Sequence, residues 1–448
     1  MRAQPDTVYP FFRPILRIGR CKRTLSRPMI DPSPRPSQPV MKASPKQTSA
    51  SHHLSAFRIA VWALLWCLHS AAWAVPTPAA RTVIPPDKVT ALGPLLRGAD
   101  LALLESHPNG QMRQITLFSW AAAPPNLLHY VVSHPERYRD FARNMTVCEV
   151  KQNPDGSIDQ RYEFSYPITT VGGTSRFVLH AAQPGQVVGA IDCYDPEKDG
   201  PRWHRWEFVP YQGGTIVVLS GYTDVLRSGY PIDRLIQRVP TLEYGLAMIG
   251  QMTPLLTMKQ RAEQLTSNFQ AQPPLPASEA AYSFLLEKGV VVLLRKNQGR
   301  LSELTLVSES GTAKDTVYQR ASKPDTWSQM VPSITKSQSL PTQDGTPLVE
   351  LEQSIPLLSF QTRFGVRIDA GSVDMLGFSG DLRGARMRID LRLSPTQKTL
   401  MVFRSSVAYD RASLLIRQLY KLEPLFEYGV NVGLSLVYLR GLSDQTRR

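Results

Sequence analysis

The stretch RWHRWEFVPYQGGTIVVLSGYTDV, from Arg202 to Val225, carries the clearest structural signal in this chain. Apolar and polar residues alternate on both sides of Gly213-Gly214, a pattern typical of two antiparallel strands joined by a tight turn. Side chains alternate between the two faces of a strand. The first strand therefore has one face rich in aromatic rings, formed by His204, Trp206 and Phe208.

A longer pattern of residues occurs twice along the chain. Three matches are separated by 189 positions, and these are Gly110 with Gly299, Pro135 with Pro324, and Asp155 with Asp344. After a shorter loop in the second copy the separation becomes 184, so that PTLEYG at Pro240–Gly245 recurs as PLFEYG at Pro424–Gly429. A register that stays this constant indicates two copies of one fold.

Both copies have the same expected order of elements. In the first, a strand at Gln114–Trp120 precedes a helical segment at Pro125–Ala142, and six strands follow with glycine and proline turns between them. The second copy begins with a strand at Glu303–Glu309, and one long helix closes each copy. This order is typical of the α+β class.

PERYRDF at Pro135–Phe141, the stretch Trp203–Val225 and the amphipathic closing helix resemble the START-like, helix-grip superfamily, also called SRPBCC. Its coenzyme Q-binding and polyketide cyclase branch is the nearest. The resemblance is weaker in the second copy, which has Gln397-Lys398 where the first has Gly213-Gly214. The resemblance implies two consecutive helix-grip domains, each a curved antiparallel sheet around a long C-terminal helix, with an apolar cavity between sheet and helix.

Composition and resemblance together divide the chain into five parts. These are a basic leader with a secretory signal at 1–74, a linker at 75–98, a first START-like domain at 99–265, a proline-containing linker at 266–287, and a second START-like domain at 288–442.

The repeated proline and glycine lie inside the segments expected to form the closing helices. Proline costs about 3 kcal/mol in a helix interior and glycine about 1 kcal/mol, so tertiary contacts must stabilise these helices. We expect a bend at Pro240, so that the apolar face of the helix follows the sheet, and a close approach at Gly245. Two shorter helices on either side of Pro240 are the alternative. Glu243 and Glu427 are expected on a solvated face or in structural ion pairs, with contact to a buried arginine or ligand as the alternative.

The formal charge of +14 is concentrated near the N-terminus. Residues 1–74 hold 11 Lys and Arg against two Asp, so nucleic-acid binding by the rest of the chain loses its main support. Basic residues precede the apolar run at Ile59–Trp73, and Ala72-Trp73-Ala74 has the small residues of a cleavage site. We predict cleavage near Ala74 and a periplasmic or secreted protein, with an uncleaved membrane anchor at 57–74 as the alternative.

Cysteine and histidine usage limits the chemistry. An oxidising compartment permits a structural disulfide between Cys148 and Cys193, and two free thiols are the alternative. The second copy has neither histidine nor cysteine, which argues against nucleophilic catalysis or a zinc site within it. In the first copy the carboxylates of Asp192–Asp199 lack the calcium-loop pattern, so a solvated hairpin tip is expected. We predict no catalytic residue, no metal and no cofactor.

The expected ligand pocket lies between the late strands and the closing helix of the first copy. Its predicted lining comprises His204, Trp206, Phe208, Ile216, Val218, Tyr222, Leu242 and Leu246. His204 and Tyr222 would supply the few polar groups that orient an apolar ligand. Ordinary core packing is the alternative for each apolar member.

The sequence therefore predicts an exported, non-catalytic binding or transfer protein for a hydrophobic small molecule such as a lipid, quinone or isoprenoid. Affinity would come from buried apolar area at about 25 cal/mol per Å². A polyketide aromatase/cyclase-like enzyme, which the resemblance also allows, and a scaffold with filled cavities in an envelope complex are the alternatives. Peripheral membrane contact and the oligomeric state are left open.

Overall fold

The computed structural model describes nine segments of the chain. They are residues 81–165, 170–196, 202–225, 232–266, 279–297, 300–355, 358–408, 411–422 and 425–443. The predicted leader, its cleavage site and the alternative anchor at 57–74 lie outside the described residues. Within these segments, no helix combines the length and the apolar character that crossing a bilayer requires.

The first repeat, as we call residues 81–266, follows the predicted order of elements with one additional strand at its start. Its helices are α2 (Pro86–Ala91), α3 (Gly93–Leu96), α4 (Pro125–Ser133), the 3-10 helix η2 (Pro135–Asp140), α5 (Ile232–Arg238) and α6 (Leu242–Leu265). Its strands are β1 (Ala99–Ser106), β2 (Met112–Ala121), β3 (Met145–Gln152), β4 (Ile158–Ser165), β5 (Thr170–Leu179), β6 (Ile191–Tyr194), β7 (Arg202–Tyr211) and β8 (Gly214–Thr223).

The second repeat, residues 279–443, has the same elements in the same order. Its helices are η4 (Glu279–Tyr282), α7 (Ser283–Leu286), α8 (Lys314–Ala321), η5 (Pro324–Gln329), α9 (Leu414–Leu422) and α10 (Phe426–Ser443). Its strands are β9 (Val290–Asn297), β10 (Arg300–Ser310), β11 (Ile334–Gln343), β12 (Thr346–Ile355), β13 (Leu358–Asp369), β14 (Ser372–Gly380), β15 (Arg386–Leu393) and β16 (Thr399–Ser406).

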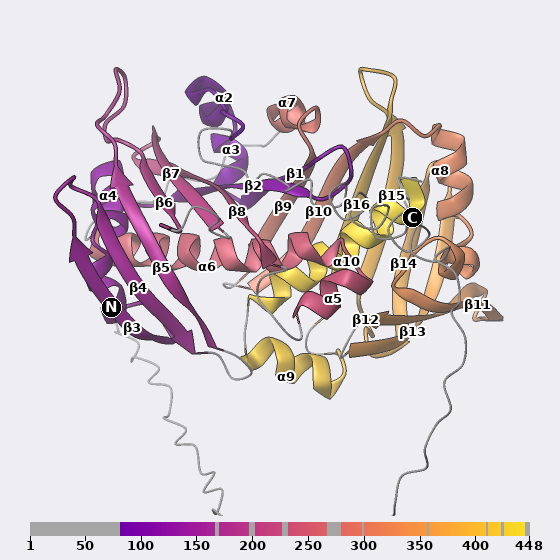
Figure 1. Ribbon diagram of the computed structural model, residues 1–448. Coiled ribbons are helices and arrows are strands. Elements are labelled where there is room, and N and C mark those ends of the chain that lie inside the picture. Colours follow the sequence, from indigo (N-terminus) through magenta and orange to yellow (C-terminus); the bar gives the residue numbers. More distant parts are fainter. Residues whose placement is uncertain are drawn as a thin grey trace, which may run out of the picture. The chain divides into compact units, whose positions relative to one another are not determined.

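All these strands form one antiparallel sheet (Figure 1), in the order β11-β12-β13-β14-β15-β16-β10-β9-β1-β2-β8-β7-β6-β5-β4-β3. The repeats join where β1 pairs with β9, with Leu101 opposite Leu293. The α+β class is therefore confirmed, but the two sheets expected to be separate are continuous. They are continuous because β1 and β9, two strands that were not predicted, pair with each other along their free backbone edges. The domain boundaries at 99–265 and 288–442 stay predictions.

The hairpin at Arg202–Thr223 forms as predicted, with its turn one residue earlier than expected. Tyr211 pairs with Gly214, so the two turn residues are Gln212 and Gly213. Both have positive φ, 47° and 77°, which is the conformation of a type I′ turn. This turn matches the right-handed twist of the strands and explains the glycine.

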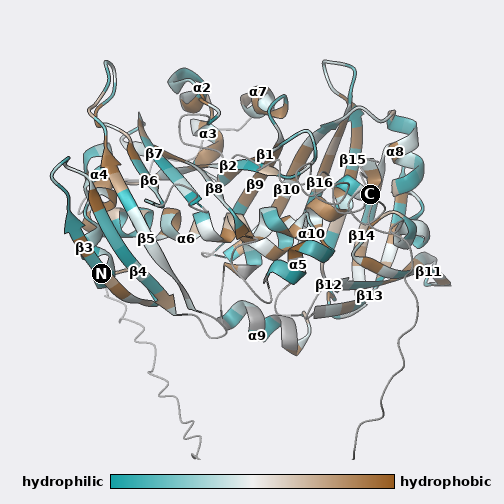
Figure 2. Cartoon of the chain, viewed as in Figure 1, coloured by the Kyte–Doolittle hydropathy of each residue, from teal (hydrophilic) through white to brown (hydrophobic). Residues whose placement is uncertain are grey.

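Helices cover the two faces of the sheet unequally (Figure 1). We call the face that contacts α6 and α10 the inner face, and the opposite face, which contacts α2, α3 and α7, the outer face. Apolar side chains of both repeats form one continuous inner core, and a smaller outer core lies beneath α2, α3 and α7. Figure 2 shows hydrophilic residues along β3 and β4, in keeping with the many half-exposed side chains of these strands.

Pro240 breaks the closing segment instead of bending it. Helix α5 ends at Arg238 and α6 begins at Leu242, so the prediction of one kinked helix is wrong and the two-helix alternative holds. The backbone N–H of Glu243 donates to the carbonyl of Pro240, which places the proline in the turn before α6. Pro424, its counterpart, lies outside the described residues.

The repeated glycines lie where α6 and α10 cross. A Cβ atom built on Gly245 would overlap the carbonyl oxygen of Gly429, and one built on Gly429 would overlap the side chain of Ile249. Because neither residue has a side chain, the two helix backbones approach directly. The close approach predicted at Gly245 is therefore made to the helix of the other repeat, and not to the sheet.

Candidate functional site

Four predicted pocket residues lie in the inner core of the first repeat. Trp206 and Phe208 on β7 are 4% and 5% exposed, and Leu242 at the start of α6 is buried with them. Leu246, one turn further along α6, is partly buried at the edge of the same core. The space between the sheet and α6 is thus occupied by side chains in this structure.

Ile216 and Val218 lie on the opposite face from the one predicted. Both belong to the outer core, together with Phe118 and Trp120. The two-residue turn pairs even-numbered residues of β7 with odd-numbered residues of β8, so Phe208 faces Val217 and Trp206 faces Leu219. A shift of one residue moves a side chain to the other face of a strand. Val217 and Leu219 therefore take the inner positions that we expected for Ile216 and Val218.

Tyr222 and His204 are half-buried at the end of the hairpin remote from its turn. Tyr222 lies opposite Trp203 in the register and packs against the edge of the inner core. The Nε2 atom of His204 is buried and has no hydrogen-bond partner among the described residues. Burial lowers the pKa of His204 to about 4, and the nearby charge of Arg202 acts in the same direction. His204 is therefore neutral at physiological pH.

Gln251 is a polar residue of the site that sequence analysis did not identify. Its side chain projects from α6, is 0% exposed, and neither its Nε2 nor its Oε1 has a hydrogen-bond partner in the described part of the chain. A Cβ atom on Gly221 would lie 2.5 Å from Cδ2 of His204 and 3.1 Å from Nε2 of Gln251. Because Gly221 has no side chain, the His204 ring and the Gln251 amide both approach the same point on the inner face of β8.

This polar pair is unusual energetically. Most buried polar groups in proteins are hydrogen-bonded, and each unsatisfied one costs about 1–3 kcal/mol. The burial of Gln251 could not be predicted from the helix sequence, because a glutamine beside Gly250 is typical of a solvated helix face. Only the packing of α6 on β8 shows that it is buried.

Arg202 and Tyr162 extend this site along the inner face. The Arg202 guanidinium lies over the Tyr162 ring, 4.9 Å from its centroid. Its Nε atom is buried and, within the described segments, has no hydrogen-bond partner. A Cβ atom on Gly173 would overlap Nη2 of Arg202, so this glycine makes room for the guanidinium. Burial raises the pKa of Tyr162, which keeps the phenol neutral.

The second repeat fills the equivalent positions differently. Met387 and Ser405 form the pair that corresponds to His204 and Gly221, because Ile389 pairs with Phe403 as Trp206 pairs with Leu219. Ser435 follows Gly429 by the same six positions that separate Gln251 from Gly245. The hydroxyls of Ser405 and Ser435 are 3.4 Å apart and form one hydrogen bond.

Aromatic rings close the interior of the second repeat. Tyr438 packs against Trp327 at 5.4 Å and against Phe403 at 6.0 Å between ring centroids. The Tyr438 hydroxyl donates to Oε1 of Gln353 over 3.3 Å, and the Trp327 indole donates to the carbonyl of Arg320 over 3.0 Å. The Tyr438 hydroxyl and the Trp327 indole thus both have hydrogen-bond partners.

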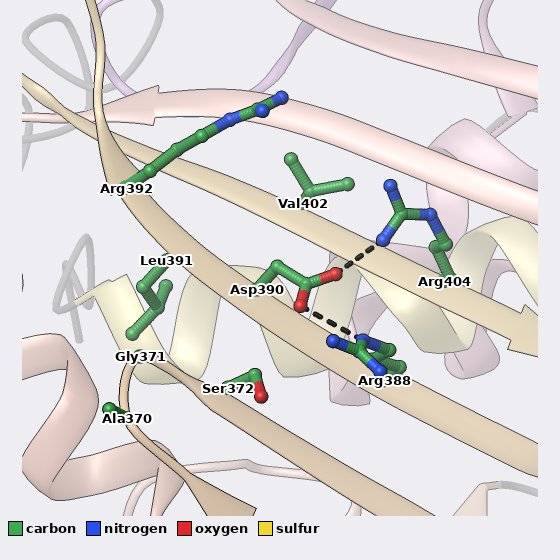
Figure 3. Close-up of a pocket in the computed structure, with 9 residues that line it drawn as sticks. All are labelled: Ala370, Gly371, Ser372, Arg388, Asp390, Leu391, Arg392, Val402 and Arg404. Carbon is green, nitrogen blue, oxygen red and sulfur yellow. Dashed lines mark hydrogen bonds and ion pairs between the residues drawn. The ribbon is translucent and has the colours of Figure 1, made fainter.

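The outer face of the second repeat carries a hollow of about 310 Å³ (Figure 3). It is lined by Ala370, Gly371, Ser372, Arg388, Asp390, Leu391, Arg392, Val402 and Arg404. Figure 3 shows the Asp390 carboxylate between the guanidinium groups of Arg388 and Arg404, and both form ion pairs with it. Three arginines and one aspartate line this hollow, and it lies on the face opposite α10. It is not the predicted cavity.

The cysteines and acidic residues have structural surroundings. Cys148 and Cys193 are free thiols, so the disulfide alternative does not hold. The Asp192 carboxylate accepts hydrogen bonds from Arg205 at 3.0 Å and lies 2.7 Å from Nε2 of His180. No cluster of side chains suited to a metal ion is found in the residues that the structure describes.

The repeated glutamates are buried instead of solvated. Glu243 accepts a hydrogen bond from the backbone N–H of Met112 over 3.3 Å, and burial raises its pKa to about 7. Glu427 is 1% exposed and lies 3.6 Å from Nε of Arg300. Both carboxylates therefore tie the start of a closing helix to the start of a neighbouring strand.

Comparison with protein families and with curated proteins finds no match. Among solved structures, the di-domain ARO/CYC StfQ from the steffimycin biosynthetic pathway is 11% identical with a TM-score of 0.25, and the match covers 72% of this chain and 98% of that chain. A START superfamily protein from Mycobacterium smegmatis is 18% identical with a TM-score of 0.24, covering 30% and 94%. A STAR-related lipid transfer protein from Xanthomonas axonopodis is 16% identical with a TM-score of 0.23, covering 34% and 94%. Nothing about the function of this chain follows from TM-scores this low.

Proposed function

We propose that this protein is an exported, non-catalytic binding or transfer protein for one apolar small molecule, a lipid, quinone or isoprenoid, held under α6 in the first repeat. The observation that supports this most is the buried amide of Gln251 beside Nε2 of His204, since neither group has a hydrogen-bond partner among the residues that the structure describes. A polar atom of a ligand at this point would complete their hydrogen bonds. Its apolar remainder would contact Trp206 and the neighbouring core.

Several of the side chains that fill the space under α6 are methionines. Met248, Met252 and Met258 of α6 all belong to the inner core, as do Met112 and Met145 of the sheet. Methionine is unbranched and polarizable, so a wall of methionines adapts to an incoming molecule at low cost. Burial of about 300 Å² of apolar ligand surface would contribute about 7 kcal/mol before the entropy cost of association.

The second repeat has a supporting role in this proposal. Its Ser405–Ser435 hydrogen bond and its aromatic core leave no unsatisfied pair at the equivalent position. We therefore expect one ligand per chain, bound by the first repeat.

The test uses the full chain. Solvent extraction and mass spectrometry of the purified protein should release one apolar compound per chain, and the emptied protein should bind the neutral probe N-phenyl-1-naphthylamine at one saturable site. Trp206→Ala should lower probe affinity more than the matched Ile389→Ala, which truncates the equivalent core position of the second repeat. If neither a co-purified compound nor probe uptake is found, the scaffold alternative replaces this proposal, and turnover of a polyketide would favour the cyclase-like enzyme.

Export forms a separate part of the proposal, and it rests on the signal pattern before Ala74. Sequencing the N-terminus of protein recovered from the periplasm or medium should give Val75. A chain that keeps residues 57–74 and sediments with membranes would favour the anchor instead.

A further inference from the structure

Arg202 is a cation on the inner face of the first repeat. Among the described residues it forms neither an ion pair nor a side-chain hydrogen bond, and its Nε is buried. Its neighbours behave differently. Arg205 on the same strand binds Asp192, and Arg176 on β5 binds Asp159 through two hydrogen bonds of 2.7 and 2.9 Å. The backbone N–H of Asp195 donates to the carbonyl of Arg202, but no side-chain ion pair joins the two residues within the described structure.

We propose that Arg202 receives the single acidic group of an amphipathic ligand, so that the molecule held by the first repeat is a long-chain acid with its head at Arg202 and its tail along β7. This inference rests on the function proposed above and adds the chemical class of the ligand. An unpaired, partly buried guanidinium is stabilised most by a carboxylate or phosphate, which accepts two parallel N–H bonds from it.

The surroundings hold the guanidinium ready for such a partner. The Tyr162 ring lies under the guanidinium, with its centroid 4.9 Å from Cζ of Arg202, which supports the cation from one side. A side chain at Gly173 would overlap Nη2 of Arg202, and one at Gly221 would overlap Cδ2 of His204, so these two glycines let both side chains lie on the inner face. A head group at this place could also accept or donate hydrogen bonds with His204 and with the amide of Gln251.

The distance along β7 from Arg202 to Phe208 indicates the length of the ligand's apolar tail. Arg202, His204, Trp206 and Phe208 share the inner face of β7 in this order, from a polar end to an aromatic end. Six residues of a strand span about 20 Å, so the apolar part of the site suits a long alkyl chain better than a short acid.

The second repeat lacks each member of this head-group site. The register places Leu351 opposite Thr362 where the first repeat has Tyr162 opposite Gly173. Ala385 stands two residues before Met387, as Arg202 stands two residues before His204. A preference for acids should therefore arise from the first repeat alone.

The test compares hexadecanoate, its methyl ester, hexadecyl phosphate and acetate, each titrated into the full chain below its micelle concentration. Hexadecanoate should bind at least about tenfold more tightly than the methyl ester, since a hydrogen bond to a charged group contributes that much. Hexadecyl phosphate distinguishes a carboxylate-selective site from one that accepts either acid, and tight binding of either acid supports the inference. Acetate should not bind measurably.

Two substitutions assign the preference to Arg202. Arg202→Gln should reduce affinity for the acid about tenfold or more and leave affinity for the methyl ester within about twofold. Arg202→Lys, which keeps the charge but loses the bidentate geometry, should be intermediate. The matched control is Arg161→Gln, because Arg161 precedes Tyr162 on β4 and is exposed in a surface pair with Glu149. Thermal unfolding of each variant checks that it folds.

The outcomes separate the two proposals. Equal binding of acid and ester by the unmodified protein, or unchanged acid binding by Arg202→Gln, would overturn the acidic head group and leave the apolar site standing. Binding of acetate as tight as that of hexadecanoate would also overturn it. Failure of all three long-chain compounds to bind, while N-phenyl-1-naphthylamine still binds, would overturn it as well, whereas failure of the neutral probe too would remove the proposed function itself.

Discussion

The Cα of Gly245 on α6 lies so close to the backbone of Gly429 on α10 that neither residue could carry a side chain. These glycines occupy the same place in the two repeats, so the duplicated motif packs against its own copy. The crossing joins the inner cores of both repeats, as the pairing of β1 with β9 joins their sheets. Contact between the repeats is therefore built from the elements that define each repeat.

Gly245→Ala should lower the free energy of unfolding by about 1–3 kcal/mol, because the new methyl group overlaps the Gly429 carbonyl. Gly250→Ala is the matched control in the same helix, since nothing lies within 4 Å of its added Cβ. It should be neutral or stabilising by up to about 1 kcal/mol. Chemical denaturation of both variants measures the difference, and equal stabilities would contradict a tight crossing.

Gln251→Leu should raise the free energy of unfolding by about 1–3 kcal/mol, because leucine fills a similar volume without an unsatisfied amide. Ser435→Ala, at the equivalent position, should have the opposite sign and cost about 0.5–1.5 kcal/mol, since it breaks the bond to Ser405. Urea unfolding midpoints test the pair. Destabilisation by Gln251→Leu would mean that ordered water already satisfies the amide.

Glu243 should make the protein less stable as pH rises through the weakly acidic range. Its pKa is about 7 in the folded state, against 4.5 for an ordinary glutamate, because burial disfavours the carboxylate. The folded state thus binds more protons than the unfolded state between these values, and stability falls as pH rises from 4.5 to 7. Glu243→Gln should remove up to about 3 kcal/mol of this dependence.

The comparison with unmodified protein is made by denaturation at pH 4.5 and pH 8. The advantage of Glu243→Gln should be small at pH 4.5 and largest at pH 8. A constant difference between the two proteins at both pH values would show that Glu243 titrates normally.

His204 should act with the opposite sign. Its folded-state pKa of about 4 lies below the usual 6.5, so the unfolded state binds more protons between these values. Its contribution to stability is therefore present above pH 6.5 and is lost as pH falls towards 4. His204→Gln should flatten this part of the profile, by about 1–3 kcal/mol between pH 7 and pH 4. Measuring His204→Gln in the Glu243→Gln background separates the two titrations. If the loss of stability between pH 7 and pH 4 is unchanged by His204→Gln, His204 is not its source.

Local features of the fold could be predicted from the chain alone. The alternation from Arg202 to Tyr211 placed Trp206 and Phe208 on the inner face, and the duplicated motifs predicted two copies of one order of elements. These predictions succeed because side-chain direction and turn formation depend on residues a few positions apart. The predicted face of Ile216 and Val218 was wrong, because it depends on the pairing register between two strands and not on residues a few positions away.

The site depends on contacts that no local pattern contains. Gln251 has the sequence surroundings of a solvated helix residue, and it is buried only because α6 packs on Gly221 of β8. The guanidinium of Arg202 lies against Tyr162 and Gly173 because β4 and β5 bring these two residues to it, and within the described segments it forms no ion pair.

By itself, the sequence determined the α+β class, the duplication and the inner face of β7, since each follows from the spacing of apolar, glycine and proline residues along a short stretch. Tertiary structure alone decided that the two repeats share one sheet, that their glycines meet, and that one repeat keeps unpaired polar groups where the other is closed. The physical reason is that these features arise from pairing between segments far apart in the chain, and the free energy of such pairing depends on which surfaces meet.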